Sequence, residues 1–140
     1  WAIVFFLLYS SINSLAQVGT EPIDSVKEIL IDSMPQPTIE FDVDSYDLGS
    51  IPSDTIIQRT FAFKNSGTDT LELISTTADC SCTVPSFTPG KFLPGETGFI
   101  KVSFSGKDNI GRFIQYITVL HNASEGYTFL TLKGFVEEKL

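Results

Sequence analysis

The sequence predicts an all-β domain built as an antiparallel sandwich, on the basis of its composition, its apolar pattern and its turns. Twelve Phe and four Tyr occur with a single Met and a single Trp among 140 residues, and aromatic residues favour strands. Short runs in which apolar and polar residues alternate are separated by Gly, Pro, Asn and Asp, as in half-buried strands joined by turns. We see no long helix that would supply a parallel crossover.

The first strands follow Pro37, where apolar residues begin to recur at every second position. This period places them on one face of each strand, which we expect to face the core. The run that ends at Asn65-Ser66-Gly67 stops at residues that favour turns. The expected strands carry Ile39 and Phe41; Tyr46 and Leu48; Ile57, Phe61 and Phe63; and Leu71 and Leu73.

The second half of the chain repeats this pattern. Turns are expected at 94–96, at 108–111 and at 122–126, each of which contains Gly. The strands between them carry Ile100, Val102 and Phe104; Ile117 and Val119; and Leu130, Leu132 and Val136. We expect a core that contains Phe61, Phe63, Val102, Ile117 and Leu132.

About seven or eight strands at this spacing predict an immunoglobulin-like antiparallel β-sandwich over residues 38–140. A closed barrel is the alternative architecture. The domain differs from an antibody domain, because its only Trp is Trp1 and its two Cys are too close in sequence to bridge two sheets.

The N-terminus has the pattern of an export signal. An apolar run from Ala2 to Tyr9 is followed by Ser14-Leu15-Ala16, a small-x-small cleavage pattern before Gln17. We therefore expect residues 1–16 to be a signal peptide whose start is missing, and residues 17–37 to be a linker with an alternative short helix near Leu30. The run is too short to span a membrane. The mature protein is expected to be periplasmic or extracellular.

The chain is acidic, with nine basic and seventeen acidic residues and a net charge of -8. Such a chain repels phosphate backbones and anionic lipid unless its cations cluster, so we expect no nucleic-acid partner.

Several motifs together resemble a known bacterial family. They include Tyr46-Asp-Leu-Gly-Ser-Ile51, Phe61-Ala-Phe-Lys-Asn-Ser-Gly67, Cys80-Ser-Cys-Thr83, Pro94-Gly-Glu96, Gly111-Arg-Phe113 and Leu132-Lys-Gly-Phe-Val136. Their order resembles domain-of-unknown-function family 1573, which is similar to the immunoglobulin-like domains of the major-sperm-protein, PapD-like and ASH group. The resemblance implies fold and export but no activity. The family usually has Gly where this chain has Ser81, and a residue with a Cβ disfavours a left-handed backbone at that position.

Cys80 and Cys82 are the candidate site residues. In an extended strand their Cα atoms would lie roughly 6.6 Å apart, near the upper limit for a disulfide, and a bend at Ser81 would bring them closer. Three interpretations remain: a structural pair, a redox-active disulfide, or ligands for Cu(I) or zinc. Two thiolates fall short of a structural zinc site, which would also need His121 or another chain.

No catalytic site is expected, because acid-base and nucleophilic sites commonly use His and the chain has only His121. We find no nucleophile elbow, phosphate loop or zinc-protease motif. The sequence therefore favours a non-catalytic interaction or structural module of the cell envelope. It would need no cofactor and would bind another envelope protein through a sheet face or an edge strand. The alternative is a thiol-redox or copper/zinc-binding protein that acts through Cys80 and Cys82.

Overall fold

The computed structural model describes residue 30 and residues 33–140, and the part from Pro35 to Leu140 forms one compact unit. The expected signal peptide and most of the expected linker lie outside the described residues, and so does the alternative short helix apart from Leu30, which is helical. The strands are β1 Ile39–Phe41, β2 Ser45–Pro52, β3 Ile56–Asn65, β4 Leu71–Ala78, β5 Thr83–Phe87, β6 Lys91–Phe92, β7 Thr97–Ser105, β8 Gly111–His121 and β9 Tyr127–Glu137.

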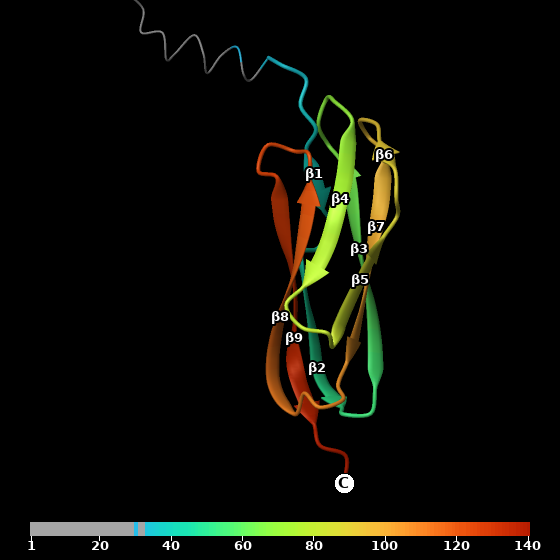
Figure 1. Ribbon diagram of the computed structural model, residues 1–140, viewed down its shortest axis with the longest axis vertical. Helices are drawn as coiled ribbons and strands as arrows, with labels where there is room; N and C mark the ends of the chain where they lie inside the picture. Colours follow the sequence, from blue (N-terminus) through green and yellow to red (C-terminus); the bar gives the residue numbers. More distant parts are fainter. Residues whose placement is uncertain (1–29, 31–32) are drawn as a thin grey trace, which may run out of the picture. The chain divides into compact units, whose positions relative to one another are not determined.

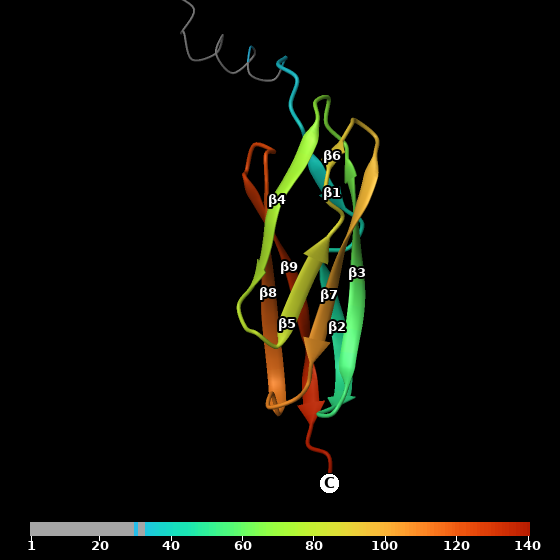
Figure 2. The same cartoon turned by 45° about the vertical axis from the view of Figure 1, so that its right-hand side comes forward.

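These strands form a two-layer sandwich (Figure 1). One sheet has the order β1-β3-β7-β5 and the other has the order β2-β9-β8-β4-β6. All pairings are antiparallel except that between β2 and β9, which is parallel. The turned view in Figure 2 shows β4 and β8 of one sheet on the left, beside β5, β7 and β3 of the other sheet on the right. The predicted sandwich is therefore confirmed.

The described chain has nine strands rather than seven or eight. The difference comes from β5 and β6, which are short and carry little apolar alternation. Pro85 lies inside β5; a proline cannot donate to a sheet ladder, and β5 tolerates it because it is an edge strand.

The core lies between the sheets and contains the residues that the alternation predicts. Phe61, Phe63, Val102, Ile117 and Leu132 are all buried. Further buried apolar side chains come from both layers, among them Leu71, Ile100, Phe104, Val119, Leu130 and Val136. Because apolar residues recur at every second position along β3, β7, β8 and β9, one face of each strand packs into the core.

Gly98 permits a close contact between the two layers. It is the register partner of Phe63 in the β3–β7 ladder. A Cβ at this position would lie 2.4 Å from the Phe63 ring and 2.7 Å from the Phe92 ring. A larger residue would therefore displace the aromatic pair that connects the sheets.

Asn65 closes the turn that was expected at Asn65-Ser66-Gly67. Its amide oxygen accepts hydrogen bonds from the backbone N–H groups of Thr38 (3.3 Å) and Gly67 (3.0 Å). Its amide nitrogen donates to the carbonyls of Asp69 (2.7 Å) and Phe92 (2.9 Å). The buried side chain thereby joins the approach to β1, the β3–β4 turn and β6.

Candidate functional site

The outer face of the five-stranded sheet carries an unusual number of exposed apolar side chains. They lie on β4, β8 and β9, and their exposed fractions run from 39% to 62%. We call this surface the apolar face, and it consists of Ile74, Ile114, Tyr116, Leu120, Tyr127, Phe129 and Phe135. Because neighbouring residues of a strand point to opposite faces, these side chains point away from the core that Ile117, Val119 and Leu130 fill.

The strand register makes the apolar face continuous. Leu120 pairs with Tyr127 across the β8–β9 ladder, and Thr118 pairs with Phe129. The ring of Phe129 lies 5.2 Å from that of Tyr127 and 6.4 Å from that of Tyr116, in tilted, edge-on arrangements. Three aromatic rings thus form one exposed cluster that extends from the middle of β8 to the start of β9.

The outer face of the four-stranded sheet differs from the apolar face. Its exposed large apolar residues are Ile56, Phe99 and Val84, one on each of three strands. Polar side chains surround them, including Gln58, Thr60, Lys64, Lys101 and Ser86. The apolar surface is therefore a property of one sheet and not of the whole domain.

Alternation assigned only the core-facing side chains of β8 and β9, so sequence reasoning missed this face. A signal was present, because β8 carries Phe113, Ile117 and Val119 at one parity and Ile114, Tyr116 and Leu120 at the other. Apolar residues at both parities are typical of a strand that is covered on both faces.

A shallow cleft of about 200 Å³ opens at one end of the apolar face. Arg112 and Lys133 line it together with Ile114, Phe135 and Asp47. The cleft lies where the register of β2 against β9 shifts between Asp47 and Ser50. Gly49 takes a left-handed φ of 64° in this bulge, and the Asp47 carboxylate accepts its N–H at 2.9 Å.

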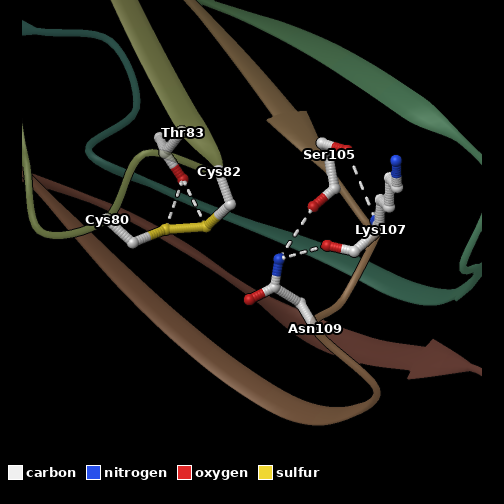
Figure 3. The surroundings of a disulfide bond; sticks show 6 residues. All are labelled: Cys80, Cys82, Thr83, Ser105, Lys107 and Asn109. Atoms are coloured by element: carbon white, nitrogen blue, oxygen red, sulfur yellow. Dashed lines mark hydrogen bonds between the residues drawn. A yellow bond between two sulfur atoms is a disulfide. The ribbon is translucent and has the colours of Figure 1, made fainter.

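Cys80 and Cys82 form a disulfide in the turn between β4 and β5, with their Cα atoms 5.3 Å apart (Figure 3). Both residues are half-buried, and Ser81 between them is exposed. The Thr83 hydroxyl lies 3.9 Å from the Cys80 sulfur and 3.7 Å from the Cys82 sulfur. Ser81 has no left-handed φ, so the segment bends without the conformation that would require glycine.

The backbone around the disulfide is held by its own hydrogen bonds. The Thr83 N–H donates to the Cys80 carbonyl at 3.2 Å, and the Ser105 N–H donates to the Cys82 carbonyl at 2.8 Å. On the neighbouring β7–β8 turn, Asn109 donates to the carbonyls of Ser105 and Lys107 (Figure 3). The turn does not therefore depend on the sulfur–sulfur bond alone.

His121 lies far along the sheet from the cysteines. It pairs with Leu73 near the start of β4, whereas Ala78 at the end of β4 pairs with Ile117. The structure therefore does not bring His121 to Cys80 and Cys82. Within the described residues, no group of three or more His, Cys, Asp or Glu side chains could hold a metal ion.

The His121 ring is buried and both of its nitrogens have partners. Nδ1 accepts the Ala123 N–H at 3.2 Å, and Nε2 lies 2.9 Å from the Thr128 hydroxyl. Burial lowers the pKa of His121 below its ordinary value of 6.5, while the carboxylate of Glu125 opposes this shift. The ring is thus a neutral structural group that its neighbours keep from solvent.

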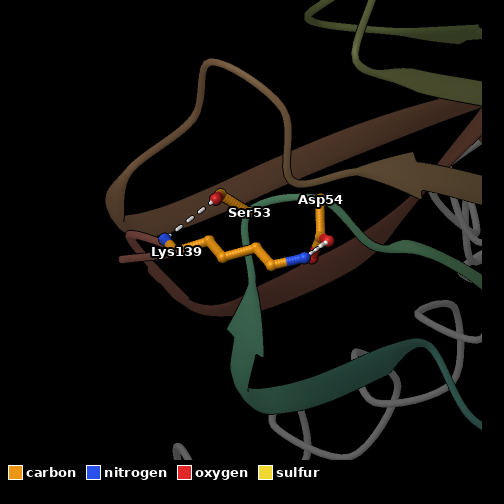
Figure 4. Close-up of polar contacts among 3 residues, drawn as sticks. All are labelled: Ser53, Asp54 and Lys139. Atoms are coloured by element: carbon orange, nitrogen blue, oxygen red, sulfur yellow. Dashed lines mark hydrogen bonds and ion pairs between the residues drawn. The ribbon is translucent and has the colours of Figure 1, made fainter.

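An ion pair ties the end of the chain to the β2–β3 turn (Figure 4). The Lys139 ammonium binds the Asp54 carboxylate, and the Lys139 N–H donates to the Ser53 hydroxyl at 3.2 Å. The hydrogen bond and the opposite charge lower the pKa of Asp54 and raise the pKa of Lys139. Both side chains are exposed, so this pair is a surface clamp rather than a reactive site.

The family model described as "Protein of unknown function (DUF1573)" matches residues 39–136. No functionally curated protein is detectably similar to the chain in sequence. Within the described residues, no helix is long and apolar enough to cross a membrane.

Solved structures with the same fold come from several sources. A protein of unknown function from Porphyromonas gingivalis is similar with a TM-score of 0.64 and 13% identity, over 71% of this chain and 46% of its own. A PapD-like (ASH) domain of human CEP192 has a TM-score of 0.61 and 12% identity, over 93% and 98%. The Vibrio cholerae VesB protease has a TM-score of 0.54 and 12% identity, over 79% and 34%. This chain spans less than half of the Porphyromonas and Vibrio proteins, and at these identities the likeness shows the fold alone.

Proposed function

This chain belongs to the DUF1573 family of proteins of unknown function, and from that premise we propose that it is an exported, non-catalytic immunoglobulin-like module that binds another protein of the bacterial cell envelope. The binding surface is the apolar face of the five-stranded sheet. The similar PapD-like domain shares only the fold, so the proposal depends on the surface and not on that likeness.

The observation that carries the proposal is the concentration of seven exposed large apolar side chains on one face. A contiguous apolar surface with polar residues around it marks an interaction site, because burying such surface is worth roughly 25 cal/mol per Å². The cleft of about 200 Å³ at one end of the apolar face is smaller than most small-molecule pockets. A protein surface fits it better than a small ligand does.

The chemistry of the described residues favours binding over catalysis. The only His is buried, and both ring nitrogens are engaged. The exposed side chains of Asp54 and Lys139 form an ion pair, so each charge is balanced by the other. Neither site offers a general base beside a nucleophile.

Site-specific photo-crosslinking tests the docking surface. We replace Phe129 with benzoylphenylalanine in the full chain, irradiate producing cells and analyse adducts by mass spectrometry. The matched control carries the same group at Phe99, which is exposed to a similar extent on the opposite sheet. We expect protein adducts from position 129 at several times the control yield. Equal yields, or adducts with lipid or glycan only, would refute the proposed function.

Export is the second part of the proposal and is supported by the apolar run and the Ser14-x-Ala16 pattern. Intact-mass analysis of the protein from a native-like bacterial host should show a chain that begins at Gln17. A cell-associated product that retains residues 1–16 in the membrane fraction would contradict export.

A thiol-redox role through Cys80 and Cys82 is the second candidate function. It is favoured by the half-buried disulfide in a turn whose central residue, Ser81, is exposed. While the sulfurs are bonded to each other they cannot act as thiolate ligands, so copper or zinc binding would first require reduction. Equilibration with glutathione buffers of known potential tests this role. A bond that stays oxidised at cytosolic potentials would rule out ready thiol exchange.

A further inference from the structure

We propose that the protein partner presents a carboxylate beside apolar side chains, and that this carboxylate binds between Arg112 and Lys133 at one end of the apolar face. The inference rests on the proposed function, because it names the chemistry of the partner that the face would bind. Its basis is the placement of the two cations, the lack of an ion pair to either of them within the described residues, and the cleft between them.

The strand register brings the two cations together. Arg112 pairs with Phe135 and Ile114 pairs with Lys133 in the β8–β9 ladder. Arg112 and Lys133 are therefore diagonal neighbours on the outer face, whose backbones lie roughly 7 to 8 Å apart. Both side chains are exposed and line the same cleft. A single carboxylate can reach both cations at this separation.

Within the part of the chain that the structure describes, neither cation is held in an ion pair, although the Asp47 carboxylate lines the same cleft and Asp47 is the register partner of Lys133 across the β2–β9 ladder. The one salt bridge among the described residues is that of Lys139 with Asp54. Two carboxylates belong to this end of the sheet, that of Asp47 and that of Glu137, which lies two residues beyond Phe135, and each accepts a hydrogen bond from elsewhere in the chain. Asp47 accepts the Gly49 N–H, and Glu137 accepts the Ser50 hydroxyl at 2.7 Å. The arginine fork and the lysine ammonium thus remain available to an external anion.

Two neighbouring cations are notable in this chain, because it has only nine Lys and Arg residues in total. Two of them border an apolar surface on a protein whose net charge is -8. Ile114 and Phe135 lie beside them and lead toward the Tyr116–Phe129 ring pair. The cleft is lined by two cations and one carboxylate, that of Asp47, so this end of the face keeps an excess of positive charge while the rest of its length is apolar.

This combination favours a carboxylate on a protein over a polyphosphate or an anionic membrane. The overall negative charge repels extended polyanions, and two cations are too few to offset that repulsion. An amphipathic protein segment satisfies both parts of the surface, because its apolar side chains cover the rings while one Asp or Glu binds the cations.

The test starts from the adducts formed at position 129. The crosslinked segment is identified by peptide mass spectrometry, synthesised with a fluorophore, and titrated against the full chain by fluorescence anisotropy. We expect it to contain an Asp or Glu close to apolar residues. Arg112→Gln and Lys133→Gln should each raise Kd about tenfold, the effect of losing one charge-assisted hydrogen bond.

Two controls make the result specific. Lys101→Gln removes an exposed cation from the opposite sheet and should change Kd by less than twofold. Replacing the acidic residue of the peptide with its amide should weaken binding to the native chain, and Arg112→Gln should then have little additional effect.

The outcomes separate this inference from the proposed function. Protein adducts whose segment has no acidic residue, or whose Kd is unchanged by both cation variants, would overturn the inference and leave the docking surface in place. A phosphorylated segment as the preferred ligand would also overturn it. If position 129 forms no protein adduct above the Phe99 control, the docking surface itself is wrong.

Discussion

Phe63 on β3 and Phe92 on β6 meet edge to face between the two sheets, with ring centroids 4.9 Å apart. Phe63 belongs to the four-stranded sheet and Phe92 to the five-stranded sheet, and both rings are buried. Phe41 adds a tilted contact with Phe63 at 5.8 Å. This aromatic cluster joins three strands, so it should contribute strongly to the cohesion of the sandwich.

Phe63→Ala should lower the free energy of unfolding by about 3 to 5 kcal/mol, the range for removing a large core aromatic. The cost arises because the neighbouring rings of Phe41 and Phe92 cannot fill the space left behind. Urea denaturation followed by far-ultraviolet circular dichroism measures the change. Phe99→Ala is the control, since Phe99 is 49% exposed, and it should cost under about 1 kcal/mol. An unchanged midpoint for Phe63→Ala would contradict the packing described above.

Asn65→Ala should destabilise the domain by about 3 kcal/mol, because four backbone groups lose their partner inside the fold. The same denaturation experiment measures it. Asn109→Ala is a matched control, because that half-buried amide donates only two hydrogen bonds, at 3.2 and 2.9 Å. We expect the control to cost about 1 kcal/mol. Equal losses of unfolding free energy for the two variants would show that the four hydrogen bonds of Asn65 stabilise the fold no more than the two of Asn109.

The sequence predicted the core-facing half of the sandwich better than its outer half, for a physical reason. A period of two identifies which residues share a face, and Phe61 with Phe63 and Ile117 with Val119 are buried accordingly. The same period assigns every remaining residue to the solvent-facing side. An apolar outer face is therefore overlooked unless the residues on the two sides of each strand are compared. Tyr116 and Phe129 were missed in this way, although they lie within strands that the pattern identified.

The cysteine turn and the cationic cleft depend on tertiary geometry that local patterns do not contain. Whether Cys80 and Cys82 bond to each other depends on the bend between two strands of different sheets. Arg112 and Lys133 are 21 residues apart in the sequence, and only the β8–β9 register makes them neighbours. The sequence therefore left the disulfide as one of three interpretations of the two cysteines, and it contained no sign of the cation pair.

Stability should decrease as the pH falls below 6.5, because burial lowers the pKa of His121 in the folded state. Between the two pKa values His121 binds a proton in the unfolded chain but not in the folded chain. The free energy of unfolding therefore falls with a slope of up to about 1.4 kcal/mol per pH unit. This loss stops below the folded pKa, and the contribution is fully retained above the unfolded pKa. Urea denaturation between pH 7.5 and 5.5 measures the slope.

His121→Gln should flatten this pH dependence over the same range. The direct measurement is an NMR titration of the imidazole, which needs no assignment because the chain has one His. A pKa at or above 6.5 in the folded protein, or identical slopes for the native and variant chains, would contradict the account of a buried neutral ring.

Reduction of the Cys80–Cys82 bond should leave the fold intact. The ring closes over only three residues, so the chain-entropy contribution is at most about 1.5 kcal/mol. The backbone hydrogen bonds of Thr83 and Ser105 to the two cysteine carbonyls persist without the sulfur bond. We therefore expect the Cys80→Ser/Cys82→Ser variant to fold, with a spectrum like that of the native chain and a slightly lower unfolding midpoint.

Thiol labelling with mass spectrometry, run beside metal analysis of freshly purified protein, tests the shared state of the two cysteines. Because each sulfur is the partner of the other, both should resist labelling before reduction and both should label after it. Labelling of one cysteine alone would instead indicate disulfide exchange with a separate protein. Stoichiometric copper or zinc that disappears in the double Ser variant would refute the disulfide as the resting state, because the metal requires free thiolates. A loss of cooperative unfolding on reduction would show that the bond, and not the surrounding hydrogen bonds, maintains the β4–β5 turn.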